Sequence, residues 1–168
     1  SGNKDGPGGT FTNFPNNFYA IFNRASPDGW KYFAHDMEHT FDVGAPRIEI
    51  RDRGVQWQHF NVHWLHEQLI ENARYIRRFK KRVGVHFFGD GALTRENALA
   101  RLDARSQEIH EAMIAHSARW GDAGNGRSNR PYTRRTWLNA VKSLRTFIAN
   151  RNEDLLDQFI RLGWYQGV

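Results

Sequence analysis

The 168-residue chain contains no cysteine, which excludes both a disulfide framework and a zinc site with cysteine ligands. It also lacks any apolar stretch near the roughly 20 residues that a membrane-spanning helix requires. Acidic residues are scarcer than basic ones, with 18 Asp and Glu against 24 Lys and Arg, so the net charge is +6. A basic balance of this kind favours phosphate or nucleic-acid partners.

What the chain does contain is the composition of a folded globular domain, with 39% hydrophobic and 14% aromatic residues. Its length is sufficient for one domain with a hydrophobic core. The chain begins SGNKDGPGG, without an initiator methionine or a recognisable leader. We therefore expect a piece of a longer protein, whose targeting signal lies outside this sequence.

Residue patterning predicts a mainly α fold with a small antiparallel β-hairpin, an α+β arrangement. Residues 1–16 are rich in Gly, Asn and Pro and are expected to form a flexible lead-in loop. Residues 17–168 are expected to form a single domain. Its hairpin is predicted over 17–36, around the turn sequence ASPDG.

Apolar residues at three- and four-residue steps predict helices in the rest of the chain. Thr94, Thr133 and Asn152 are the expected N-caps of the last three, and Gly163 is expected to end the fourth. The predicted helices cover residues of about 62–83, 95–119, 134–150 and 153–162.

The segment KYFAHDMEHTF concentrates four potential ligands at the end of the hairpin: His35, Asp36, Glu38 and His39. A zinc hydrolase motif, H-E-x-x-H, needs its Glu next to the first His and a helix to align both His. Glu38 is misplaced for that motif, and a strand separates positions four apart by about 13 Å. Asp36 and Glu38 face one side of a continued strand, and carboxylates suit Mg²⁺ or Mn²⁺. A buried polar network that only orders the turn remains the alternative.

The densest basic run is RRFKKR, Arg77–Arg82, near the end of a predicted helix. Cations at a helix C-terminus complement the helix dipole, which favours a solvated helix end. The alternative is nucleic-acid binding, which predicts an affinity that falls steeply with salt. We do not expect nucleic acid as the partner.

Several stretches resemble the CotH, or spore-coat protein H, kinase-like family. TNFPNNFYA and DGWKYFAHDMEHTF resemble its loop, hairpin and acidic turn. The segments NVHWLHEQLIENARYIRRFKKRV, the long helix ending in SARWGD, and the C-terminal RPYTRRTWLNAV onward resemble its later helices. The resemblance extends over nearly the whole chain from Phe11 on.

The resemblance implies the helical C-terminal lobe of an atypical protein-kinase-like fold, which transfers a phosphoryl group from ATP to a protein acceptor. It implies Mg²⁺ or Mn²⁺ with ATP, and an extracellular or cell-envelope location in a bacterium. Asp36 matches the metal-binding Asp, Asn17 the metal-binding Asn, and Glu38 the second acidic position of the turn.

Two positions depart from the family pattern. Asn13 stands where the family has the catalytic Asp, and an amide cannot accept the proton of an acceptor hydroxyl. His35 stands where the family has a Trp. The alternative function is therefore a non-catalytic structural or adhesive module of a large cell-surface protein. We also expect this chain alone to be inactive, because it lacks the strands that grip the nucleotide.

Overall fold

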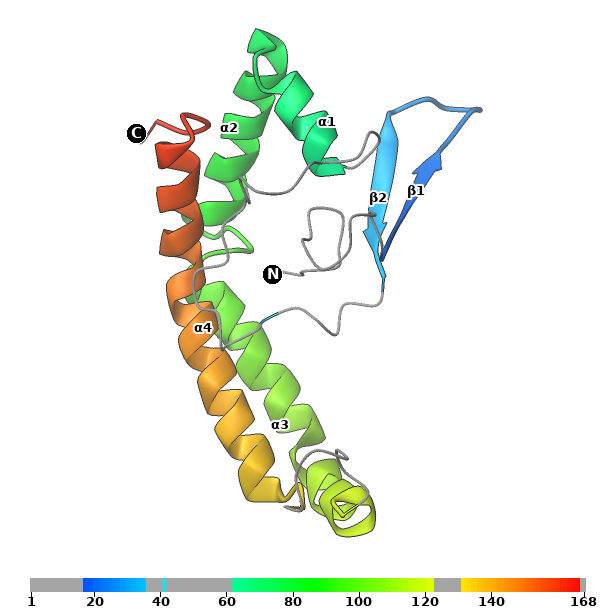
Figure 1. Ribbon diagram of the computed structural model, residues 1–168, viewed down its shortest axis with the longest axis vertical. Coiled ribbons are helices and arrows are strands. Elements are labelled where there is room, and N and C mark those ends of the chain that lie inside the picture. Colours follow the sequence, from blue (N-terminus) through cyan, green and yellow to red (C-terminus); the bar gives the residue numbers. More distant parts are fainter. Residues whose placement is uncertain (1–16, 36–40, 42–61, 123–130, 167–168) are drawn as a thin grey trace. The chain divides into compact units, whose positions relative to one another are not determined.

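The computed structural model describes residues 17–35, 41, 62–122 and 131–166 (Figure 1). It is mainly helical with one two-stranded antiparallel sheet, which confirms the predicted fold class. Within these ranges no helix combines the length and apolarity needed to cross a membrane. The elements are strands β1 (Phe18–Phe22) and β2 (Trp30–Ala34) and helices α1 (Val62–Leu69), α2 (Ala73–Phe87), α3 (Arg95–Trp120) and α4 (Arg134–Arg161).

The chain divides into two compact units. One comprises the residues up to Lys81 together with those from Leu155 on, and the other comprises residues 82–154. The predicted lead-in loop over residues 1–16 lies outside the described ranges. That residues 17–168 form a single domain stays a prediction.

The hairpin forms where the sequence predicts it. Asn23 starts the turn, since its side-chain Oδ1 accepts hydrogen bonds from the backbone N–H groups of Ala25 and Ser26 at 3.0 and 3.2 Å. The antiparallel ladder then pairs Phe22 with Trp30 and continues residue by residue to Phe18 opposite Ala34. The hairpin is thus built from a local polar turn and paired aromatic strands.

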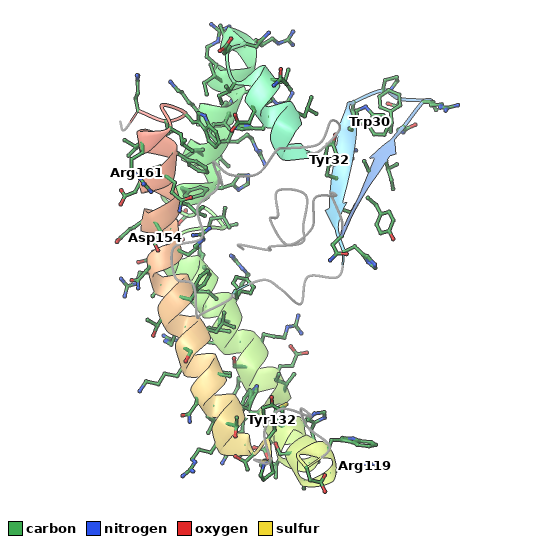
Figure 2. The ribbon with its side chains drawn as sticks, in the orientation of Figure 1. Trp30, Tyr32, Arg119, Tyr132, Asp154 and Arg161 are labelled. Atoms are coloured by element: carbon green, nitrogen blue, oxygen red, sulfur yellow. The ribbon has the colours of Figure 1, made fainter. Side chains whose placement is uncertain are left out.

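Both faces of the hairpin carry apolar side chains, because aromatic residues occupy consecutive positions as well as alternate ones. Trp30 and Tyr32 project from β2 (Figure 2) and are 62% and 44% exposed. Phe22 packs against Trp30 with ring centroids 5.4 Å apart. Cross-strand aromatic pairs of this kind stabilise a two-stranded sheet.

The prediction of one helix over residues 62–83 is wrong, because the chain breaks between α1 and α2. Asn72 Oδ1 accepts hydrogen bonds from the backbone N–H groups of Arg74 and Tyr75, at 3.0 and 3.1 Å. These are the groups that an N-cap side chain satisfies, so Asn72 starts a new helix. α2 then continues to Phe87, beyond the predicted end at residue 83.

The first unit is held together by an aromatic cluster, which we define as His66, Tyr75, Phe79, Phe159 and Trp164. Trp164 is 6% exposed, and its ring centroid lies 4.4 Å from that of His66 and 6.3 Å from that of Phe79. Phe79 in turn meets Phe159 edge to face at 5.2 Å. Such contacts add to the roughly 1.5–3 kcal/mol gained by burying each large apolar side chain.

Trp164 reaches this cluster because α4 ends in a tight turn. Gly163 has φ +73°, its N–H donates to the Ile160 carbonyl at 3.0 Å, and the Trp164 N–H donates to the Phe159 carbonyl at 2.9 Å. This pair of bonds closes a helix end when a residue with positive φ, favoured by glycine, follows it. The predicted end at Gly163 is confirmed.

In the second unit, α3 and α4 run antiparallel, side by side (Figure 1). The predicted caps are confirmed: Thr94 Oγ1 accepts from the Asn97 N–H, and Thr133 Oγ1 accepts from the Thr136 N–H. At the far end the Tyr132 N–H donates to the Gly121 carbonyl at 2.8 Å. A Cβ on Gly121 would stand 2.2 Å from the Tyr132 carbonyl oxygen, so this closure requires glycine.

The predicted break before residue 153 is wrong, since α4 runs unbroken through Asn152. The side chain of Asn152 does not cap a helix. Its Nδ2 donates instead to the carbonyl oxygens of Phe87 and Leu93, at 3.3 and 2.7 Å. The backbone at Asn152 is helical, and the donor end of its side chain satisfies two carbonyls distant in sequence.

Candidate functional site

The hairpin places Asn17 opposite the start of the segment HDMEH. The His35 backbone N–H donates to the Asn17 carbonyl oxygen at 3.1 Å, which extends the strand ladder beyond Phe18 and Ala34. Asp36 follows His35 directly in the chain. Asn17, a predicted metal-binding residue, is therefore hydrogen-bonded to His35, the residue that precedes Asp36, a second predicted metal-binding residue.

Asn17 itself is held in an uncommon conformation. Its φ is +55°, and it is 7% exposed. Non-glycine residues rarely adopt positive φ, and Asn is among those that tolerate it best. Both the polarity and the backbone preference of Asn suit this position, so the same observation fits a ligand-bearing residue and a turn-forming one.

His35 packs against Tyr19 at the same end of the hairpin. The ring centroids lie 5.1 Å apart in an edge arrangement, on the face that Tyr19 and Phe33 share. The family pattern singled out His35 as a departure, but the sequence did not identify Tyr19 as its contact. The residues' shared face follows from the strand register, which the local sequence signals only weakly.

The other predicted site residues, Asn13, Asp36 and Glu38, lie outside the described ranges, as does His39. Their roles stay predictions. Among the residues that the structure does describe, no three His, Asp or Glu side chains are grouped closely enough to hold a metal ion.

The opposite end of the hairpin has a different carboxylate. Asp28 pairs with Lys31 at 2.7 Å, with both side chains more than half exposed, so the pair adds about 1 kcal/mol at most. β2 has 5 residues and separates Asp28 from the Asn17 end by roughly 17 Å. Asp28 is thus an acidic residue of the same hairpin that belongs to the turn and not to the candidate site.

A second polar group lies within the aromatic cluster and was not singled out from the sequence. His66 Nδ1 and the Tyr75 hydroxyl oxygen are 2.7 Å apart, and desolvation by burial raises the pKa of Tyr75. Tyr75, Phe79 and Trp164 contact the His66 ring. This part-buried contact pairs His66 Nδ1 with the Tyr75 hydroxyl and joins α1 to α2, so its role is structural.

The CotH kinase protein family model matches residues 9–155, and the chain therefore belongs to this family. The match includes Asn13, Asn17, Asp36 and Glu38, and it makes the chain kinase-like at the level of the family. Searches of the curated proteins and of the solved structures found no significant match.

Proposed function

We propose that the chain forms the metal- and acceptor-side lobe of an ATP-dependent phosphotransferase. Membership of the CotH kinase protein family supports this proposal. The observation that supports the proposal at the level of residues is the hydrogen bond between the His35 N–H and the Asn17 carbonyl. It brings a candidate amide ligand to the residue that precedes Asp36.

The donor set suits a hard cation. Asp36 and Glu38 would supply carboxylate oxygens and Asn17 an amide oxygen, which are the ligand types that Mg²⁺ takes together with phosphate oxygens and water. An ion bound there would neutralise charge on the nucleotide phosphates. Asp36 is the principal ligand in this proposal, with Asn17 and Glu38 completing the protein's share.

Asn13, in the position of the family's catalytic Asp, is expected to lower the rate of phosphoryl transfer. Its amide can orient an acceptor hydroxyl by hydrogen bonding but cannot take the proton. Because phosphoryl transfer has a loose transition state that depends mainly on positioning, loss of the base slows the reaction without removing the rest of the machinery. The same residue favours the second candidate function, a non-catalytic structural or adhesive module.

The first test is cation binding by the chain in the presence of ATP, followed by electron paramagnetic resonance of Mn²⁺. Asp36→Asn is expected to weaken Mn²⁺ binding more than roughly tenfold, because even outer-shell partners of a bound metal contribute about 10- to 100-fold. Asp28→Asn is the matched control, since it removes the same charge from the same hairpin, and it should bind as the wild type does. Equal binding by all three proteins would contradict the assignment of Asp36.

The second test is transfer of labelled phosphate from ATP by the natural protein that contains this chain, at its full length. We expect activity to be lost in Asp36→Asn and to rise in Asn13→Asp, which restores a base. A protein that binds Mn²⁺ and ATP but shows no transfer in any variant has the site without the reaction. Absence of both binding and transfer would favour the structural module.

A further inference from the structure

The outward side of α2 carries a cluster of positive charge. Arg74, Arg77, Arg78 and Lys81 lie three, four and seven positions apart, so they share one side of the helix, and all four are exposed. We call these four residues the cationic face. It extends over roughly 10 Å of helix.

The charges of this face are not neutralised within the part of the chain that the structure describes. No described residue forms a salt bridge or side-chain hydrogen bond with any of the four, and α2 contains no Asp or Glu. Some cations on the other helices are paired: Arg105 pairs with Glu108 on α3, and Arg145 pairs with Asp103 between α4 and α3. The cationic face is thus available to an external anion.

The helix dipole does not explain these residues. α2 continues to Phe87, so His86 is the basic residue of its last turn and the cationic face lies upstream of it. The dipole acts within the last turn only. Like charges three or four positions apart repel one another on a helix, so the arrangement costs stability and needs another explanation.

The apolar side of α2 is already occupied, which restricts the kind of partner. Tyr75 and Phe79 pack within the aromatic cluster, and Phe87 is buried. A helix that binds a membrane surface inserts its apolar side into the lipid, and this side is not available. Binding of single-stranded nucleic acid uses exposed aromatic residues for base stacking, and the aromatic residues of α2 are half-buried or buried.

We propose that the cationic face of α2 binds an acidic segment of a partner protein. Three of its four cations are arginines, whose planar guanidinium groups hold carboxylates through two parallel hydrogen bonds. Glu or Asp residues at three- and four-residue steps on a helix, or at alternate positions of an extended strand, match the spacing of the face. The proposal does not depend on phosphoryl transfer.

The test measures binding of the chain to a fluorescein-labelled peptide of alternating glutamate and serine, by fluorescence anisotropy. The variant Arg74→Gln/Arg77→Gln/Arg78→Gln/Lys81→Gln is expected to bind at least about tenfold more weakly than the wild type. The affinity of the wild type should fall between about 0.05 M and 0.3 M salt, because exposed charges are screened.

The control removes the same number of charges elsewhere, at exposed cations with no partner among the described residues. It is the variant Arg24→Gln/Arg95→Gln/Arg135→Gln/Lys142→Gln. This protein should retain the wild-type affinity; an equal loss in both variants would show that net charge alone attracts the peptide and would overturn the proposal. Tighter binding to single-stranded DNA or to anionic phospholipid vesicles at the same salt, with the same loss in the first variant, would also overturn it.

Discussion

At the scale of single residues, the partly buried Tyr75 hydroxyl is expected to make the stability of the fold depend on pH. Its hydroxyl lies 2.7 Å from His66 Nδ1, and burial raises its pKa above the ordinary value of 10.0. The folded state therefore retains the phenol proton at pH values where the unfolded chain has released it. By linkage, this contribution to stability is fully present below about pH 10 and is lost as the pH rises toward the raised pKa.

We predict that Tyr75→Phe removes this part of the alkaline loss of stability. At neutral pH the variant should be less stable by about 1 kcal/mol, since the contact with His66 is lost. Urea unfolding of both proteins from about pH 8 to 11 measures the effect, and the difference in their free energies of unfolding should shrink above about pH 10. A constant difference over this range would contradict the prediction.

Single residues also show what the sequence reveals of the site. The caps at Thr94 and Thr133 were predictable, because a capping hydroxyl bonds to backbone groups a few residues away. The contact between Tyr19 and His35 was not, since it joins residues on different strands and follows from their register. Asn17 was selected through the family pattern, and its positive φ and burial are properties that only coordinates supply.

At the scale of elements, two asparagines account for the errors in the predicted helices. Asn72 lies within an apolar pattern that continues across it, and yet its side chain caps α2. Asn152 resembles a cap in sequence, and yet it lies inside α4 with its amide bonded to Phe87 and Leu93. Periodicity predicts which segments are helical. Whether an asparagine caps a helix or lies inside it depends also on its side-chain hydrogen-bond partners, which for Asn152 include a carbonyl 65 residues away.

We predict that Asn72→Ala lowers the free energy of unfolding by about 1 kcal/mol, because the first backbone N–H groups of α2 lose their acceptor. The matched control is Asn139→Ala on the exposed side of α4. It should leave stability unchanged or raise it by a few tenths of a kcal/mol, roughly the helix propensity gained with alanine. Chemical denaturation of the two variants beside the wild type measures both changes, and equal destabilisation would show that Asn72 is not a cap.

At the scale of the whole molecule, the net charge of +6 and the sequence pI of about 10.0 arise partly from α2. The four residues of the cationic face form four like-charged pairs at three- and four-residue spacing. Each pair lowers the stability of the helix by about 0.2–0.5 kcal/mol. Repulsion between these charges therefore lowers the stability of the free protein. The feature proposed for function and the feature that opposes folding are the same.

We predict that neutralising the cationic face with four glutamines raises the free energy of unfolding by about 1 kcal/mol at low salt. Glutamine has nearly the helix propensity of arginine and lysine, so the change reports charge repulsion. Urea unfolding at low and at high salt measures it, and the gain should shrink as salt screens the charges. A loss of stability in both conditions would indicate that these residues make favourable contacts within the protein.

The fold class and the family were predictable at this scale because both rest on patterns spread over the chain. The mainly helical composition and the hairpin of β1 and β2 follow from periodicity, and the match to the CotH kinase protein family extends from residue 9 to residue 155. The roles of Asn13, Asp36 and Glu38 depend on positions in space relative to a cation and an acceptor. A sequence pattern supplies those residues but not their geometry.

The hydrogen bond between the Tyr132 N–H and the Gly121 carbonyl marks the connection between α3 and α4 as a position for inserting additional residues. It holds together the two ends of the connection between α3 and α4, so residues inserted into that connection lengthen a segment whose ends are already joined. The entropic cost of a longer loop grows only with the logarithm of its length, about 0.6 kcal/mol for each doubling. An epitope, a fluorescent label or a further domain could thus be grafted there while the helices remain paired beneath it.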